Sequence, residues 1–448
     1  MTPRAIRKKI CDNGLISQLP NHLICHILSF LSTKDAIRAS VLSTRWRSLW
    51  QLVLGLDLDS LDLGLAFASS QFSTIDDFVV FVDKFFYHHR ESCIHKLRLH
   101  IRTVGYVDYS SYLTKWIDAA TTRRIQHLDL HCDRLFKVAV KIPLSLYTSE
   151  TLVHLRLVRV ILVSTKVVSL PCLKTLHLEF VKYTDETTLE KLISCSPVLE
   201  DLSIVKYTED NARAIQVRSK TLKRVDINQW YDREYGLVID APLLQFLRII
   251  AYSTKNIKII NTGLPAKVDI DANVLSILDP NDLTSRSMMR DFFTSISRVR
   301  CLVTSYATTK DIFHYMQLEP LHQFCNLTGL SVICCISSLE MLLNLLKRCP
   351  KLESLSLKLV DYKETKKAGV ITSTVPSCLV SSLKFVKLEG VLFGCGTELN
   401  VARYFLENST LLEKLTLRND YKEKNVEHVR QTLHAIPRCS CTCTVVLL

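Results

Sequence analysis

The chain has 448 residues, 48% of them hydrophobic and 23% charged, with a formal net charge of +13. The apolar fraction is sufficient for a packed core and excludes an intrinsically disordered chain, while the sparse glycine and proline exclude collagen-like and low-complexity sequence. No run of about 18 apolar residues occurs, so no membrane span is expected. The positive charge would suit a polyanion. The lysines and arginines are scattered, however, so a nucleic-acid partner is an alternative that rests on charge alone.

Residues 1–14 are predicted to form a basic, flexible tail. The tail contains Arg4, Arg7, Lys8 and Lys9, which could also serve as a nuclear signal, and it shows no signal-peptide pattern. The 16 cysteines lack the paired spacing of a disulfide framework. We therefore expect reduced thiols and a location in the cytoplasm, the nucleus or both.

Residues 15–52 are predicted to form three short helices. Pro20 suits a first helical turn, and apolar residues follow it at helical spacing up to Leu31. Ser32 with Asp35 resembles a capping box at the start of a second helix. A third helix carries Trp46 and Trp50. A segment of about 35 residues cannot bury so much apolar surface alone, so this segment is expected to dock against something else.

The same segment resembles an F-box, through Leu19-Pro20, Ile27-Leu28, Val41-Leu42-Ser43 and Trp46-Arg47-Ser48-Leu49-Trp50. Asn21 departs from the acidic residue usual after the proline. The resemblance implies a module that binds the Skp-family adaptor of a Skp–cullin–F-box ubiquitin ligase. The alternative is a three-helix start of some other domain. The residues expected to contact the adaptor, or to support that contact by packing, are Leu19, Pro20, Leu23, Ile27, Leu28, Leu31, Val41, Leu42, Trp46 and Trp50.

From Leu52 onward the pattern L-x-x-L-x-L recurs about every 21 to 31 residues, as in leucine-rich repeats. The copies include IHKLRL, IQHLDL, LVHLRL, LKTLHL, LEDLSI, LKRVDI, LQFLRI, LTGLSV, LESLSL, LKFVKL and LEKLTL. In each copy the last two apolar residues point inward from a short strand and the residue between them points to the opposite face. Stacked units build a continuous core. Weaker copies are expected at Val268–Ile270 and Val299–Leu302, and an earlier strand at Leu54–Leu58.

The predicted fold class is therefore α/β: an N-terminal three-helix F-box followed by a leucine-rich-repeat solenoid, a curved parallel sheet with helices on its convex side. Helices are expected at 77–87, 112–120, 187–194 and 339–347. Residues 53–375 are assigned to the repeat array. Residues 376–448 are assigned to a domain that continues the array and resembles the FBD domain through Leu383–Leu388 and Ala402–Asn408. With the repeats, this resemblance indicates a plant F-box protein with leucine-rich repeats and an FBD domain.

No phosphate loop, nucleophile elbow or H-E-x-x-H motif is present, so we expect neither catalysis nor a cofactor. Asp57, Asp59 and Asp62 alternate with leucines and are interpreted as a solvated strand face rather than an acid–base or metal cluster. Cys439, Cys441 and Cys443 alternate near the C-terminus, with His428 and His434 before them; we interpret the three thiols as one face of a strand rather than a zinc site. The pair Cys334-Cys335 is interpreted in the same way, as buried thiols.

Function is then expected from surfaces. The outward strand positions are predominantly basic, and one hypothesis is that they bind an acidic or phosphorylated target segment. The alternative is an ordinary solvated strand face. Candidate target-binding residues are Arg98, His131, Arg156, His177, Arg224 and Arg248. The predicted function is the substrate receptor of a Skp–cullin–F-box ligase, reaching a cullin scaffold through the adaptor and binding an unidentified protein target. The alternative is an adaptor-bound scaffold that acts outside a ligase.

Overall fold

The computed structural model describes residues 19–41, 44–60, 74–102, 109–133, 140–206, 214–229, 235–251, 254–260, 266–272, 282–360, 374–390, 397–419, 431–433 and 435–448. The predicted tail 1–14 and the residues Leu42, Asp62, His428 and His434 lie outside these ranges. The chain forms two compact units, Met1–Thr188 and Leu189–Leu448.

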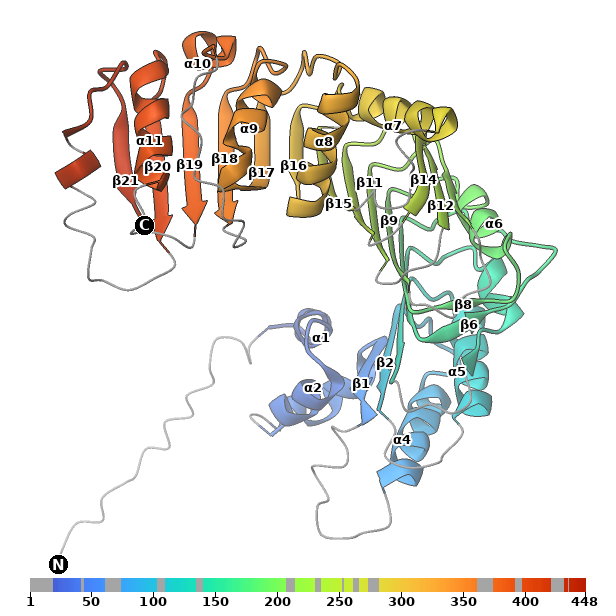
Figure 1. Ribbon diagram of the computed structural model, residues 1–448. Coiled ribbons are helices and arrows are strands. Elements are labelled where there is room, and N and C mark those ends of the chain that lie inside the picture. Colours follow the sequence, from blue (N-terminus) through green and yellow to red (C-terminus); the bar gives the residue numbers. More distant parts are fainter. Residues whose placement is uncertain are drawn as a thin grey trace, which may run out of the picture. The chain divides into compact units, whose positions relative to one another are not determined.

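Unit 1 begins with three short helices, which we call the helical module (residues 19–53; Figure 1). They are α1 (Asn21–Leu28), α2 (Thr33–Ala39) and η2 (Trp46–Leu52). Ser32 caps α2 as predicted, because its Oγ accepts a hydrogen bond from the Asp35 N–H at 3.1 Å. Two details differ from the sequence prediction. The first helix ends at Leu28 rather than Leu31, and the third is a 3₁₀ helix, a form common in short connecting pieces.

The repeats of unit 1 form a parallel sheet that begins directly after the helical module. Its strands pair in the order β1 (Gly55–Asp59), β2 (Lys96–Ile101), β3 (His127–Cys132), β5 (His154–Val158) and β7 (Thr175–Glu179). Leu97, Leu128, Leu155 and Leu176 are in register on the inner face and are buried. Burying one leucine side chain contributes about 1.5–3 kcal/mol, so this ladder of repeated leucines holds the strands together.

The described parts of the segments between these strands contain helices and short strands. The helices are α4 (Thr74–His88), α5 (Ser110–Thr122) and the 3₁₀ helix η4 (Leu144–Thr148). Three very short strands, β4 (Val140–Lys141), β6 (Val160–Leu162) and β8 (Lys182–Tyr183), pair in parallel as a second small sheet. Helices α4 and α5 were predicted from the sequence, whereas this second sheet was not.

Unit 2 begins at Leu189, the second residue of α6 (Thr188–Ser194), and contains a longer parallel sheet. All neighbouring strands in it are parallel, as expected for repeats. In order they are β9 (Asp201–Lys206), β11 (Arg224–Gln229), β13 (Phe246–Ala251), β15 (Lys267–Ala272), β16 (Cys301–Thr304), β17 (Gly329–Cys335), β18 (Ser354–Val360), β19 (Phe385–Gly390), β20 (Lys414–Asn419) and β21 (Thr444–Leu447).

A second three-stranded sheet accompanies the first part of unit 2. It consists of β10 (Ala214–Arg218), β12 (Tyr235–Asp240) and β14 (Thr254–Ile260), again parallel. Each of these strands follows one strand of the main sheet, so the chain alternates between the two sheets. Ile215, Val217 and Ile239 are buried and contribute to the core. In these repeats a second strand, rather than a helix, follows the strand of the main sheet.

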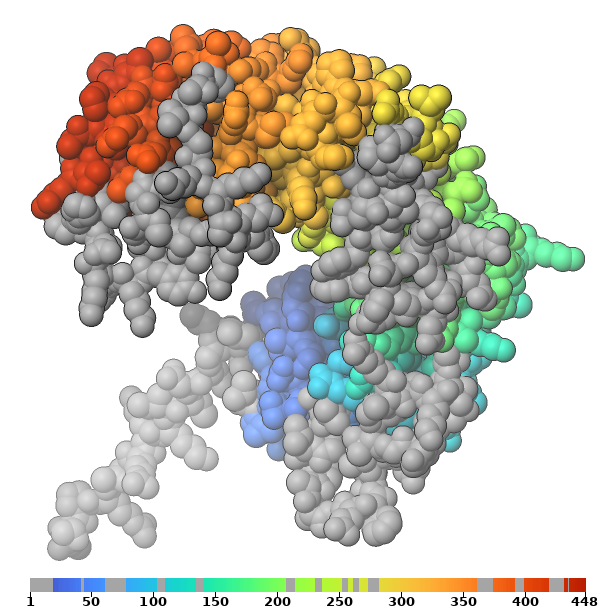
Figure 2. Space-filling view, in the orientation of Figure 1, coloured from blue at the N-terminus to red at the C-terminus, as the bar shows by residue number. Residues whose placement is uncertain are grey.

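Helices follow the later strands of unit 2 and lie beside one another in Figure 1. Their bounds are α7 (Leu283–Ile296), α8 (Tyr306–Leu318), η5 (Ile336–Ser338), α9 (Leu339–Leu346), α10 (Ser377–Ser381) and α11 (Thr397–Asn408). Asp282 and Ser305 cap α7 and α8 by accepting from the N–H groups of Ser285 and Thr308. The yellow-to-red repeats form a continuous packed surface in the view of Figure 2.

These observations confirm the predicted fold class, an α/β protein with N-terminal helices and a parallel sheet of repeats. The prediction for the C-terminal cysteines is wrong. β21 begins only at Thr444, and the Cys443 N–H donates to the Ser440 carbonyl in a turn. Cys439 and Cys441 are exposed, whereas Cys443 is buried, so the three thiols do not share one strand face. Within the described ranges, no helix is long and apolar enough to cross a membrane.

Candidate functional site

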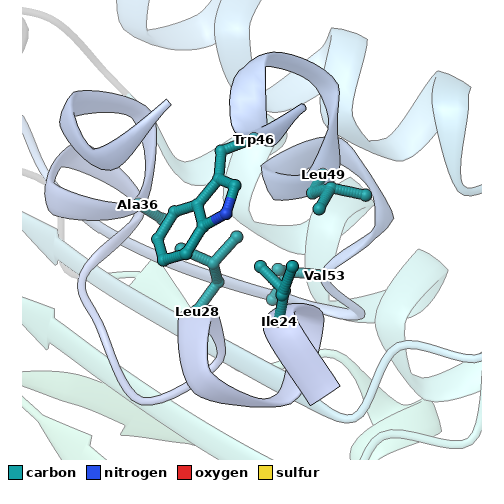
Figure 3. Packing of buried hydrophobic residues seen from close by; sticks show 6 residues of the cluster. All are labelled: Ile24, Leu28, Ala36, Trp46, Leu49 and Val53. Atoms are coloured by element: carbon teal, nitrogen blue, oxygen red, sulfur yellow. The ribbon is translucent and has the colours of Figure 1, made fainter. Parts of the chain in front are cut away.

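The helical module has a small core of its own (Figure 3). Ile24 and Leu28 of α1 pack with Ala36 of α2 and with Trp46 and Leu49 of η2. Val53 completes the cluster, and Leu19 and Trp50 pack against it while remaining partly exposed. The first and third helices are thus held together by side chains that face inward.

A second set of apolar side chains on α1 and beyond faces solvent. Leu23 and Ile27 are 41% and 39% exposed, and their spacing of four residues places them on one side of α1. Leu31, which follows the helix, is also 39% exposed. Phe30 is 75% exposed and its ring lies edge-on to His26, with centroids 5.0 Å apart. Val41, after α2, is 86% exposed. We call Leu23, Ile27, Phe30, Leu31 and Val41 the exposed apolar face of the module.

The described residues among those predicted to contact the adaptor therefore separate into three groups. Leu23, Ile27, Leu31, Val41 and Pro20 are exposed, and Leu19 and Trp50 are half-buried. Leu28 and Trp46 are buried in the module's core, where they can support the exposed face by packing but present little surface themselves. Phe30 was not among the predicted residues, although it follows Ile27 by three positions and Leu23 by seven, which is helical spacing.

Three further contacts fix the module. Asn21, at the start of α1, accepts two hydrogen bonds at its Oδ1 from Arg45 Nε and Nη2, at 3.1 and 2.8 Å. Toward the repeats, Thr33 Oγ1 accepts a hydrogen bond from the Asp57 N–H at 2.9 Å, and the Trp50 ring stacks on Phe81 of α4. The module is thereby bonded to β1 and packed against α4 within unit 1.

The outward face of the unit 1 sheet has a row of alternating charges. In register along this row lie Asp57, Arg98, Asp129 and Arg156. Arg98 lies 3.7 Å from Asp57 and 3.2 Å from Asp129, and Arg156 lies 3.6 Å from Asp129 and 3.0 Å from Glu179. Lys96 also pairs with Asp57 at 2.7 Å. Partial burial opposes the charge on Arg156, but hydrogen bonds and charges from Glu179 and Asp129 outweigh it and raise its pKa.

Histidines flank this row in two stacked pairs. The rings of His100 and His131 lie 4.0 Å apart, and those of His127 and His154 lie 4.4 Å apart. Partial burial lowers the pKa of all four, and for His127 and His131 the neighbouring imidazole lowers it further. Asp59, 3.1 Å from His100 Nδ1, opposes the effect without cancelling it. These imidazoles are therefore mainly neutral near pH 7.

The six candidate target-binding residues lie on outward strand faces, four in unit 1 and two in unit 2. In unit 2, Arg224 approaches Asp201 at 4.0 Å and lies over the Phe246 ring, while Arg248 approaches Asp269 at 3.6 Å. The four arginines thus have carboxylate partners within the protein. The four arginines therefore lie in a charge-paired network rather than on the predominantly basic surface that was predicted from the outward strand positions.

The described residues contain no group of three or more histidine, cysteine, aspartate or glutamate side chains placed to hold a metal ion. Asp57 and Asp59, interpreted from sequence as solvated carboxylates, are instead ion-paired with Lys96 and Arg102. Cys334 and Cys335 are both buried, as interpreted, and burial raises the pKa of Cys334 to about 12.

Comparison with known proteins places three family models along the chain. Residues 16–54 match the F-box domain, residues 113–280 match the leucine-rich repeats of the FBD-associated F-box protein At5g56370, and residues 371–417 match FBD. The chain thus has the features of an F-box protein with leucine-rich repeats, a class that consists in general of non-catalytic adaptors. An F-box implies binding to a Skp1-family adaptor.

Full-length relatives come from Arabidopsis thaliana. The F-box/FBD/LRR-repeat protein At5g53840 is 61% identical over 99% of both chains, and the F-box/FBD/LRR-repeat protein At1g51370 is 49% identical over 99% of both. The putative FBD-associated F-box protein At5g53635 is 42% identical over 97% of this chain and 100% of its own. The chain belongs to the F-box/FBD/LRR-repeat family.

Proposed function

We propose that this protein is the substrate-recognition subunit of a Skp–cullin–F-box ubiquitin ligase. The F-box, residues 15–52, binds the Skp-family adaptor. The repeats, residues 53–375, continue through an FBD domain at 376–448 and bind a protein target, which is then ubiquitinated and degraded. We expect the complex in the cytoplasm, the nucleus or both.

The observation that carries the proposal is the exposed apolar face of the helical module. The module already has a closed core, so these side chains are not needed to hold the three helices together. Contiguous exposed apolar side chains on a soluble protein commonly mark a protein-binding surface. This face lies within the segment that matches the F-box, and it contains four of the ten residues predicted to contact or support the adaptor interface, Leu23, Ile27, Leu31 and Val41.

The protein's contribution to ubiquitin transfer is positioning. A target held on the repeats gains a high effective concentration near the ubiquitin-charged enzyme elsewhere in the complex. On the strand face, the target competes with or adds to the existing ion pairs, because the arginines proposed to bind it already have carboxylate partners. Recognition there is expected to require a target of mixed charge or one that displaces a carboxylate.

The adaptor interface is tested by introducing negative charges on the exposed apolar face. We expect Ile27→Asp with Leu31→Asp to abolish co-purification with the adaptor, because both side chains are exposed and the core residues Ile24 and Leu28 are unchanged. Leu144→Asp, at a similarly exposed leucine outside the module, is the matched control and should leave co-purification intact. Leu19→Ala with Pro20→Ala should also abolish co-purification with the adaptor. Retained binding in Ile27→Asp/Leu31→Asp would refute the proposed interface.

The ligase role is tested separately from adaptor binding. Tagged protein should co-purify a cullin through the adaptor, and deletion of the F-box should trap targets without degrading them. If the adaptor is recovered but the cullin is absent and target turnover does not respond to proteasome inhibition, the protein acts as an adaptor-bound scaffold outside a ligase.

A further inference from the structure

The helical side of unit 1 has a groove between two neighbouring helices. One wall of the groove is formed by α4 and the turn after it, and the other by α5 and its C-terminal end. The groove has a volume of about 570 Å³. Helices α4 and α5 are the light-blue and cyan helices of Figure 1.

The charges in this groove differ from those of the strand face. Four cations line it, Lys84, Arg90, Lys115 and Arg123, against one carboxylate, Asp83. Asp83 already accepts a hydrogen bond from Trp116 Nε1 at 2.7 Å and pairs with Lys115 at 3.2 Å. The positive charge in the groove is therefore largely uncompensated, whereas Arg98 and Arg156 on the strand face of the same unit are paired with carboxylates.

Arg123 shows how this positive charge is held. Its Nη1 donates to the Phe86 carbonyl at 2.9 Å, and its guanidinium lies over the Phe86 ring, 5.4 Å from the centroid. Partial burial lowers its pKa. A partly desolvated guanidinium bonded to a neutral carbonyl retains N–H donors that a carboxylate would satisfy.

The groove also offers apolar surface. Val80 is 47% exposed and Tyr87 is 70% exposed, and both line the groove beside Lys84. The Arg90 guanidinium lies over the Tyr87 ring, 5.9 Å from its centroid. The only carboxylate contact of Arg90 in the described chain is the exposed Glu91, 3.9 Å away. An aliphatic side chain could pack on Val80 and Tyr87 while neighbouring carboxylates reach the cations.

We propose that this groove binds an acidic peptide segment that carries one aliphatic residue. Lys115 on α5 and Arg123 at its C-cap are eight residues apart, or about 12 Å along the helix direction. An extended chain rises about 3.3 Å per residue, so about four residues of a bound peptide span the groove. This site lies on the helices rather than on the strand face and does not depend on adaptor binding.

The test uses the full chain and a fluorescein-labelled peptide with one leucine flanked by three glutamates on each side. Binding is measured by fluorescence anisotropy, with a peptide containing glutamine in place of glutamate as the charge control. We expect saturable binding of the acidic peptide only, weakening as NaCl is raised from about 50 to about 300 mM, because the contacts are solvent-exposed ion pairs.

Variants separate the groove from the net charge of the protein. Lys84→Glu with Arg90→Glu should weaken binding about tenfold or more, because two attractive charges become repulsive. Lys141→Glu with Lys166→Glu makes the same change in net charge at exposed lysines outside the groove and should change affinity less than about twofold. Val80→Ser should weaken binding without altering charge.

Equal weakening in the groove and control variants would overturn the proposal, since it would indicate general charge attraction. Absence of peptide binding at low salt would also overturn it. Self-association of the chain that Lys84→Glu with Arg90→Glu abolishes, without peptide binding, would identify a second copy as the occupant and overturn it too. The test leaves the F-box untouched, so its outcome is independent of the proposed ligase function.

Discussion

Arg98 on β2 and Asp129 on β3 are in register, and Arg98 Nε lies 3.2 Å from Asp129 Oδ2. Asp129 also approaches Arg156 at 3.6 Å, so one carboxylate lies between two arginines. Opposite charges on adjacent strands stabilise a sheet modestly, and like charges placed opposite destabilise it. Asp129 therefore separates two cations that would otherwise repel each other across the strands.

Asp129→Asn should destabilise unit 1 by about 1 kcal/mol, because the network is half-exposed and each arginine keeps one other carboxylate. Urea denaturation monitored by circular dichroism measures the change. Glu91→Gln, in the exposed pair with Arg90, is the control and should have no measurable effect. Equal stability of Asp129→Asn and the wild type would show that the row is electrostatically inert.

The stacked histidines predict a pH dependence of stability. Their folded-state pKa values are lowered, so the unfolded chain, with a histidine pKa of about 6.5, takes up protons first as the pH falls. Their contribution to stability is thus fully present above about pH 6.5 and is lost as the pH falls from there through the folded-state pKa.

We expect the urea midpoint to fall between about pH 7.5 and about pH 5.5, and His127→Gln to reduce that fall, because it removes one member of a stacked pair. His88→Gln, at an exposed histidine outside both pairs, should leave the slope unchanged. A slope that His127→Gln does not reduce would assign the pH dependence to other groups.

Arg124 has a left-handed backbone, with φ of 62°, at the end of α5. The next N–H, of Ile125, donates to the Ala120 carbonyl at 3.3 Å, and the Ile125 side chain is buried, as in a Schellman termination. Arg124→Gly should stabilise the protein by about 0.5–1 kcal/mol, because glycine adopts this conformation without steric cost. Arg124→Ala keeps the Cβ and should give no gain; a thermal melt in which both variants gain equally would contradict this explanation.

Thr308 joins α8 to β15 in a fully buried position. Its Oγ1 accepts from the Ala272 N–H at 2.9 Å and lies 3.1 and 2.9 Å from the carbonyls of Ile270 and Ala272. Thr308→Val preserves shape but leaves the Ala272 N–H without its acceptor, which should cost about 1–3 kcal/mol. Thr122→Val, at an exposed threonine that ends a helix, should cost much less. A near-neutral Thr308→Val in chemical denaturation would mean that another acceptor replaces the hydroxyl.

The strands of the main sheets could be predicted from sequence because the leucines alternate. Residues such as Leu97 and Leu99 are buried on one face while Arg98 faces out, which is the period of a strand. Even the weak copy before Leu302 corresponds to a strand, β16. The second sheet of unit 1 was missed because strands as short as β4 and β8, with two residues each, carry no measurable period.

Helices α7 and α8 were missed for a related reason. Their caps, Asp282 and Ser305, were visible as residue types, but their apolar residues are interspersed with polar ones such as the buried Thr308. At the C-terminal cysteines a strand was predicted where the structure has a turn. Their alternation has the period of a strand, but Ser440 Oγ donates to the Leu412 carbonyl and holds a turn there.

The charge of the strand face could not be read from composition. Sequence gives the cations at Arg98 and Arg156 but not the distances to Asp129 and Glu179, which depend on the register of separate repeats. The exposed apolar face of the helical module was partly visible, since Leu23 and Ile27 belong to the recognised motif. Which apolar residues of α1 form the core, and which remain outside, depends on where η2 packs.

The hydrogen bond between Thr33 and Asp57 joins the helical module to the first strand without any free linker between them. In the proposed ligase, a protein bound to the repeats of unit 1 would consequently be held at a fixed distance from the adaptor rather than on a flexible linker. Which lysines of that protein come within range would follow from where it binds, and moving the binding position by one repeat would select different ones.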